Sequence, residues 1–100
     1  MYLADRDFLK YPLSDKAEEK EIISGDVNIS HLYFLPGAIE SRHENERDEY
    51  MYIISGKFEF AVNGDSRVMD KGDTVYIPRG SSHSVFCLEK GEMISFQSRS

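Results

Sequence analysis

Apolar and polar residues alternate along most of this chain, and a turn signal separates each alternating run from the next. A period of two is typical of β-strands, whose successive side chains point to opposite faces of a sheet. The pattern predicts about eight short strands and almost no helix, the signature of an all-β sandwich or barrel. The expected strands cover residues 21–24, 27–35, 49–55, 57–62, 66–69, 74–77, 83–88 and 93–96.

Pairs that contain glycine or proline mark the ends of these strands. Asn63-Gly64 is the strongest signal, because both residues tolerate a positive φ and join two strands in a tight hairpin. Pro78 ends the strand that begins at Thr74, since proline cannot donate a hydrogen bond to a ladder. Further turns are expected at Gly25-Asp26, Pro36-Gly37, Lys71-Gly72-Asp73 and Lys90-Gly91.

Residues 1–24 form an N-terminal arm with a less regular pattern. Tyr11 is expected to be extended, because the proline that follows it disfavours the α conformation. Residues 14–21, SDKAEEKE, allow two interpretations. They form one helical turn capped by Ser14, or they are a charged loop or the start of a strand.

Two of the expected strands have informative faces. In 27–35, Ser30, Leu32 and Phe34 share one face and His31 lies on the other, where we expect a structural or surface role. In 49–55 both faces are apolar, so both are expected to be buried. One faces the barrel interior, and the other needs a cover, either a second sheet or another subunit. We therefore predict a homodimer, which would also cover open sheet edges.

The composition narrows the class of protein. The 100 residues are enough for one domain over residues 1–100. A net charge of −6 argues against a nucleic acid or an anionic membrane surface as partner. No apolar run approaches the roughly 18 residues of a membrane span, and the N-terminus is too charged for a secretory signal. One cysteine excludes an internal disulfide, and a cytoplasmic location is expected.

Two of the three histidines lie in motifs that begin at a glycine. Residues 37–56, GAIESRHENERDEYMYIISG, have the spacing G-x5-H-x-N-x3-E-x6-G. Residues 72–87, GDTVYIPRGSSHSVFC, have the spacing G-x5-P-x-G-x2-H-x3-C. The pair resembles the two motifs of the cupin superfamily. That resemblance implies a single-domain cupin β-barrel, also described as a double-stranded β-helix or jelly roll.

In the family, the first motif supplies two histidines and one glutamate, and the second motif supplies a third histidine. His43, Glu49 and His83 match that pattern, and Asn45 replaces the second histidine. Two imidazoles and one carboxylate form a set that binds Fe(II), Mn(II), Ni(II) or Zn(II) with open positions. Asn45 either adds a fourth ligand through its amide oxygen, holds a water or faces substrate. The alternative is a degenerate barrel that binds no metal.

A divalent metal bound by two neutral imidazoles and one carboxylate leaves a centre of about +1, which would attract a carboxylate or enediolate and polarise a carbonyl. Arginines in the same loops are candidates for pairing with a substrate carboxylate, although solvated loop charges are the alternative. Cys87 either contacts the substrate or is a buried, inert thiol. The candidate substrate-binding residues are Arg42, Met51, Arg79 and Cys87.

A closer resemblance comes from residues 55–73, SGKFEFAVNGDSRVMDKGD, followed by residues 87–94, CLEKGEMI. These runs are similar to the small cupins of pectin and alginate breakdown, which open unsaturated uronate monosaccharides to linear keto forms with a divalent metal. The resemblance implies that His43 and His83 bind metal, that Glu49 stands in place of a glutamine, and that the substrate is a sugar acid. Ser95 departs from the pattern, because an aspartate associated with proton transfer occupies its position in that family.

Two hypotheses of different classes follow. The first is a metal-dependent enzyme of isomerase, lyase or ring-opening type, acting on a small polar compound that bears a carbonyl or carboxylate. In it the metal acts as a Lewis acid, and Glu49 or a metal-bound water transfers protons. The second is a non-catalytic small-molecule-binding or sensor cupin with a degenerate metal site, which the substitution at Asn45 suggests.

Overall fold

The computed structural model describes residues 1–98, and the side chains of all of these except residues 41–43. Its strands form one antiparallel sheet of eight, and the described residues contain one short helix, the 3-10 turn η1 (Asp5–Asp7). The all-β prediction is confirmed. The strands are β1 (Leu9–Ser14), β2 (Ala17–Ile23), β3 (Asn28–Phe34), β4 (Ile39–Glu44), β5 (Glu49–Val62), β6 (Asp65–Asp70), β7 (Thr74–Ile77) and β8 (Ser82–Gln97).

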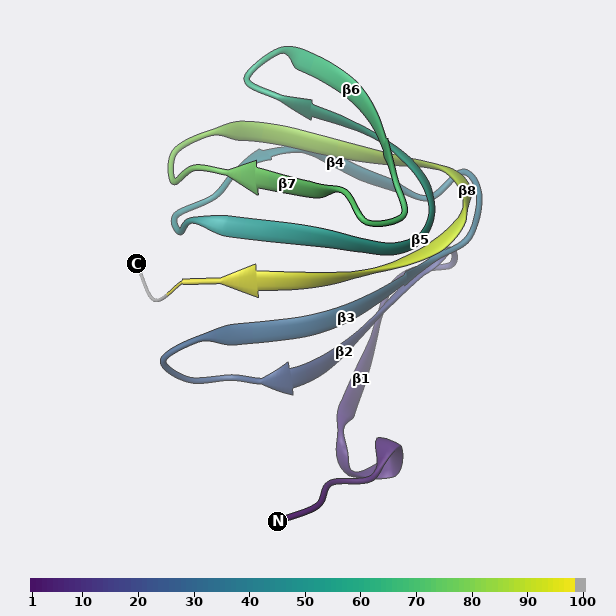
Figure 1. The fold of residues 1–100 in the computed structure, drawn as a ribbon, viewed down its shortest axis with the longest axis vertical. Helices are drawn as coiled ribbons and strands as arrows, with labels where there is room; N and C mark the ends of the chain where they lie inside the picture. Colours follow the sequence, from purple (N-terminus) through teal and green to yellow (C-terminus); the bar gives the residue numbers. More distant parts are fainter. Residues whose placement is uncertain (99–100) are drawn as a thin grey trace.

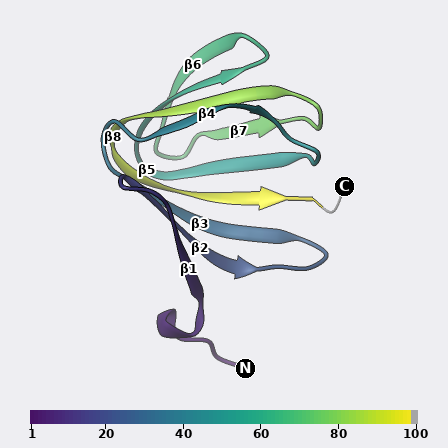
Figure 2. The same cartoon turned by 180° about the vertical axis from the view of Figure 1, so that it is seen from behind.

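The sheet curls into a barrel because its two longest strands, β5 and β8, each run through both halves of it (Figure 1). Residues 49–55 of β5 pair with residues 92–97 of β8, and residues 57–62 pair with residues 83–89. β3 adjoins the C-terminal half of β8, whereas β4 adjoins its N-terminal half. One layer therefore contains β1, β2, β3 and β7, the other contains β4 and β6, and β5 and β8 complete both (Figure 2).

Three local expectations are corrected. Of the interpretations of residues 14–21, the helical turn is wrong and the start of a strand is confirmed, because residues from Ala17 onward form β2 and pair with β3. Gly56 and Gly91 lie inside β5 and β8 rather than at strand ends, so four expected strands merge into two. β4 and β1 are additional strands, and β1 extends away from the barrel toward the N-terminus (Figure 1). The predicted hairpin at Asn63-Gly64 is confirmed, with φ of +49° and +83°.

The core lies between the two layers and consists of alternate residues along the strands. Leu32 and Phe34 of β3 are buried, and so is the face of β5 that carries Met51 and Ile53. Phe58 packs edge-on against Phe34, with ring centroids 5.3 Å apart. The remaining buried apolar residues are Ala38, Phe60, Val75, Ile77, Val85, Cys87 and Met93.

The outer face of β5 differs from the expectation. Tyr50 and Tyr52 are 48% and 44% exposed, so in the described chain no second sheet covers this face. Tyr50 lies opposite Tyr76 on β7 and opposite Phe96 on β8. These three rings form an exposed aromatic row, which is the surface that a second subunit would cover. The described part of the chain contains no helix with the length and hydropathy that crossing a bilayer requires.

Candidate functional site

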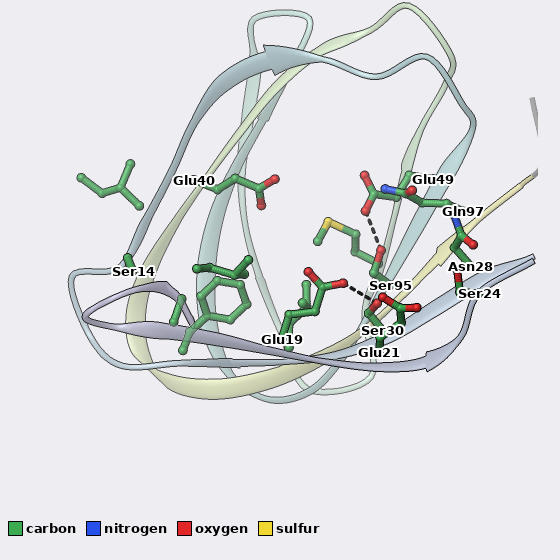
Figure 3. Close-up of a pocket in the computed structure, with 16 residues that line it drawn as sticks. Ser14, Glu19, Glu21, Ser24, Asn28, Ser30, Glu40, Glu49, Ser95 and Gln97 are labelled. Carbon is green, nitrogen blue, oxygen red and sulfur yellow. Dashed lines mark hydrogen bonds between the residues drawn. The ribbon is translucent and has the colours of Figure 1, made fainter. Parts of the chain in front are cut away.

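A cavity of about 460 Å³ lies between the two layers (Figure 3). Its walls combine apolar side chains, which shape it, with polar groups that can bind a small molecule. β2, β3, β4, β5 and β8 all contribute, because the two-residue period of each strand points alternate side chains inward. The principal polar lining residues are Glu19, Glu21, Ser30, Glu40, Glu49, Ser95 and Gln97.

Glu49 is the most deeply buried carboxylate of this wall, at 5% exposure. One of its oxygens, Oε2, accepts a hydrogen bond of 2.5 Å from Oγ of Ser95. The other, Oε1, accepts one of 2.6 Å from Nδ2 of Asn45. Buried ionisable groups need such partners, and each carboxylate oxygen keeps a second lone pair. Glu49 is thus oriented by two donors and still able to bind a cation or accept a proton.

The described cavity wall is acidic. Oε2 of Glu19 accepts a hydrogen bond of 2.6 Å from Oγ of Ser30, which fixes a second carboxylate on the side opposite Glu40 (Figure 3). Glu21 adds a fourth carboxylate. The described lining residues include no lysine, arginine or histidine. The wall offers hydrogen-bond acceptors and negative charge, so a bound anion would need a cation from elsewhere in the site.

His83 is buried at the start of β8, with 1% exposure, and its strand position agrees with the sequence prediction. Its Nε2 lies 3.7 Å from Oε1 of Glu40. The β4–β8 register places residue 43 directly opposite residue 83, and opposite residues of an antiparallel pair belong to the same face of a sheet. The side chains of His43 and Arg42 lie outside the described residues. The described side chains alone contain no cluster of three metal-binding groups.

The loop after β4 contains Asn45 and is hydrogen-bonded to the turn that contains Arg79. Asn45 lies one residue beyond β4, and its carbonyl oxygen accepts a hydrogen bond of 2.8 Å from N–H of Gly80. Asp48 accepts one of 2.8 Å from N–H of Arg79, which joins the loop to the turn between β7 and β8. The Arg79 side chain is exposed and does not line the cavity. The structure therefore brings Asn45 and Glu49 together and leaves Arg79 at the surface.

Met51 and Cys87 occupy different surroundings. Met51 lines the cavity two residues after Glu49, as the strand period predicts. Cys87 is buried in the core, where its Sγ lies 3.1 Å from the carbonyl oxygen of Glu89, and it is not a lining residue of this cavity. Desolvation by burial raises the pKa of the Cys87 thiol. These properties describe an inert core thiol.

Sequence reasoning missed the acidic half of the wall. Glu19 and Glu21 lie in residues 14–21, where the sequence allows a helical turn, a loop or a strand, and only the pairing of β2 with β3 turns them toward the cavity. Glu40 precedes an irregularity in the β4–β8 register, so counting by two from His43 gives it the wrong face. The alternation of Ala17, Glu19 and Glu21 was the available signal for the first two, once β2 is recognised as a strand.

Comparison with known proteins agrees with this architecture. Residues 30–98 match the model of the cupin domain family. The pectin degradation protein KdgF of Dickeya dadantii is 30% identical over 84 residues, which cover 82% of this chain and 76% of that protein. The structure of KdgF from Halomonas sp. superposes with a TM-score of 0.89 at 21% identity, over 100% of this chain and 95% of that one.

A more distant match is the Bacillus subtilis oxalate decarboxylase, a protein with Mn(II) centres. It has a TM-score of 0.77 at 24% identity, over 96% of this chain and 28% of that one. Its likeness concerns the fold. The family match covers most of the chain, and with the barrel and the paired motifs in place, this chain belongs to the cupin family.

Proposed function

We propose that this cupin is a metal-dependent enzyme of isomerase, lyase or ring-opening type that acts on a small polar compound bearing a carbonyl or carboxylate. The observation that carries the proposal is the cavity with the buried, doubly hydrogen-bonded Glu49 in its wall. The similarity to a pectin degradation protein supports sugar acids as the first substrates to screen.

The metal would be held by His43, Glu49 and His83, with Asn45 as a candidate fourth ligand. The β4–β8 register supports the histidine pair, and the free lone pairs of Glu49 suit a divalent cation such as Zn, Ni, Mn or Fe. When bound, such a metal acts as a Lewis acid that polarises a carbonyl oxygen. The Asn45 amide donates its N–H to Glu49, so its oxygen is the atom left for a cation or substrate.

The other residues of the chain would bind and orient the substrate. Glu49 is the candidate for proton transfer, because its carboxylate lies in the cavity wall and is held in one orientation by Ser95. Sugar hydroxyls can donate hydrogen bonds to Glu19 and Glu21, while Met51 provides an apolar contact. A substrate carboxylate would need Arg42 or the metal as its partner, since the described wall is acidic.

The test is metal content and turnover of tag-free protein purified without chelator. We expect about one transition metal per chain, as one complete ligand set predicts, and loss of it in His83→Ala. Conversion of unsaturated uronates, followed by NMR, is expected for the wild type and not for Glu49→Ala. Folded protein that takes up no metal on titration would contradict the proposal.

The second candidate is a non-catalytic small-molecule-binding cupin. The hydrogen bonds that engage both oxygens of Glu49 favour it, because they make Glu49 part of a fixed polar network. Saturable binding of a uronate without chemical change, observed by ligand NMR, would support this alternative. Appearance of a product would exclude it.

A further inference from the structure

Two serines lie side by side in the wall of the cavity. Ser30 of β3 and Ser95 of β8 are directly opposite in the β3–β8 register, are 8% and 6% exposed, and both line the cavity. Opposite residues of an antiparallel pair have their Cβ atoms about 5 Å apart on one face of the sheet. Two neighbouring hydroxyl groups therefore face the space in which a small molecule would bind.

Each serine holds one carboxylate, which comes from the adjoining strand. Oγ of Ser30 donates a hydrogen bond of 2.6 Å to Oε2 of Glu19 on β2. Oγ of Ser95 donates one of 2.5 Å to Oε2 of Glu49 on β5. Because β2, β3, β8 and β5 are consecutive strands of the sheet, the four residues form a row with a carboxylate at each end (Figure 3).

The two carboxylates reach the serine pair from opposite directions. Glu19 lies opposite Leu32, two residues beyond the serine of β3. Glu49 lies opposite Gln97, two residues beyond the serine of β8. Since β3 and β8 are antiparallel, these displacements point toward opposite ends of the two strands. The spacing of the serines then puts the two carboxyl groups roughly 5 to 10 Å apart.

Glu19 and Glu49 differ in which atoms remain available. Both oxygens of Glu49 accept hydrogen bonds, from Ser95 and Asn45. Oε1 of Glu19 accepts none from any of the described residues, and its side chain is half-buried in the cavity wall. Glu19 thus has one oxygen that fixes its orientation and another that is open to a ligand, as a carboxylate that transfers protons needs.

This spacing of carboxyl groups suits chemistry on a sugar ring. Enzymes that act on sugars place two carboxyl groups about 5 to 10 Å apart, one on each side of the bond that reacts. The opening of a cyclic hemiacetal also needs two proton transfers. The ring C–O bond breaks and its electron pair goes to the ring oxygen, which gains a proton. The hydroxyl group on the same carbon loses its proton and becomes a carbonyl.

We propose that Glu19 is a catalytic residue that takes the hydroxyl proton in such a ring opening, across the substrate from Glu49. The inference rests on the proposed function, because it assumes that the cavity binds a cyclic sugar acid. Oε1 of Glu19 accepts the proton of the hydroxyl group, and Glu49 or a water beside it supplies the proton of the ring oxygen. Water then carries the proton back from Glu19, so that both carboxyl groups end as they began.

The test is the rate at which metal-containing protein, as purified, opens an unsaturated uronate monosaccharide, followed by NMR and corrected for the uncatalysed reaction. Glu19→Gln keeps an acceptor for Ser30 and can still bind a hydroxyl group, but it takes no proton. We expect it to lower kcat about 100-fold and to change KM by less than about threefold. The control is Glu18→Gln on the exposed face of the same strand, which should leave both constants unchanged.

Two further variants separate proton transfer from folding. Glu19→Asp restores a carboxylate and is expected to have a kcat at least about tenfold above that of Glu19→Gln. Ser30→Ala leaves Glu19 in place without its donor, and we expect kcat to fall about tenfold, because a loosened base is aligned with the hydroxyl group less often. Circular dichroism checks that each variant is folded, and these two variants decide the test if Glu19→Gln is not.

A Glu19→Gln variant with the kcat of Glu18→Gln, or with a raised KM alone, would overturn the catalytic role of Glu19 while the enzyme stands. A wild type that binds metal and opens no uronate would overturn this inference alone. Folded protein that takes up no metal on titration would overturn the proposed function and this inference with it.

Discussion

Gly56 and Gly91 face each other at the point where β5 and β8 pass from one layer of the barrel to the other. A Cβ on Gly56 would lie 2.5 Å from Cα of Gly91, and a Cβ on Gly91 would lie 2.7 Å from Cα of Gly56. Neither position has room for a side chain, because the nearby atoms are backbone. The two glycines therefore let the two longest strands cross closely enough to close the barrel.

We expect Gly91→Ala to lower the free energy of unfolding by about 3 kcal/mol, because the added methyl group forces the two backbones apart. The matched control is Gly25→Ala, since Gly25 also has no positive φ and has no atom within 4 Å of an added Cβ. Urea unfolding followed by circular dichroism measures both. Equal stability of the two variants would show that the crossing tolerates a side chain.

The hydrogen bond between Ser95 and Glu49 supports a second prediction. Ser95→Ala removes a donor from a buried carboxylate, so we expect a loss of about 2 kcal/mol in unfolding free energy at neutral pH. Ser66→Ala on the exposed face of β6 is the control and should change stability little. A Ser95→Ala variant as stable as this control would mean that the bond contributes nothing to the fold.

Much of the fold follows from local pattern. The alternation placed Met51 and Ile53 on one face of β5, which the structure buries, and the Asn63-Gly64 turn predicted its hairpin with β6. The continuity of β5 through Gly56 was not predictable, because a glycine at the end of an alternating run normally marks a turn. Gly56 has a φ of +87° and still lies inside the strand. Only the close approach of Gly91, which is distant in sequence, explains why the strand continues there.

The candidate site was predictable where one motif supplies its neighbours. Asn45 and Glu49 are four residues apart, and the structure joins them by a hydrogen bond. Glu19 reaches the wall only through the pairing of β2 with β3, and Glu40 only through the irregular register of β4 with β8. Such long-range pairings leave no periodic signal of their own. The motif therefore indicated Glu49 and left the rest of the acidic wall unpredicted.

The aromatic row of Tyr50, Tyr76 and Phe96 makes the homodimer testable. Tyr50 and Tyr76 stack with ring centroids 4.7 Å apart and remain 48% and 46% exposed. We expect light scattering at micromolar concentration to give twice the chain mass of 11.5 kDa, because a continuous apolar face is stabilised by a second copy.

Tyr50→Lys should shift that dimer toward monomer, since it places a charge in the middle of the row. Val68→Lys is the control, because Val68 is 53% exposed on β6, outside the row. A monomeric wild type would contradict the prediction, and so would a dimer that responds equally to both substitutions.

The buried thiol of Cys87 should make stability depend on pH above neutrality. Burial raises the pKa of this thiol in the folded protein, whereas an unfolded cysteine has a pKa of about 8.5. Above that value the unfolded state loses its thiol proton first and binds fewer protons than the folded state. The free energy of unfolding therefore falls as the pH rises toward the folded pKa. Below about pH 8 the thiol is protonated in both states, and it causes no change of stability with pH.

Urea unfolding of the wild type and Cys87→Ala between about pH 7 and pH 10 measures the effect, since that window spans the unfolded pKa. Other titrating groups act on both proteins, so only the difference between the two slopes reports on the thiol. We expect the stability advantage of the wild type over Cys87→Ala to shrink as the pH rises. A constant difference across this range would mean that the thiol ionises as easily in the barrel as in the unfolded chain.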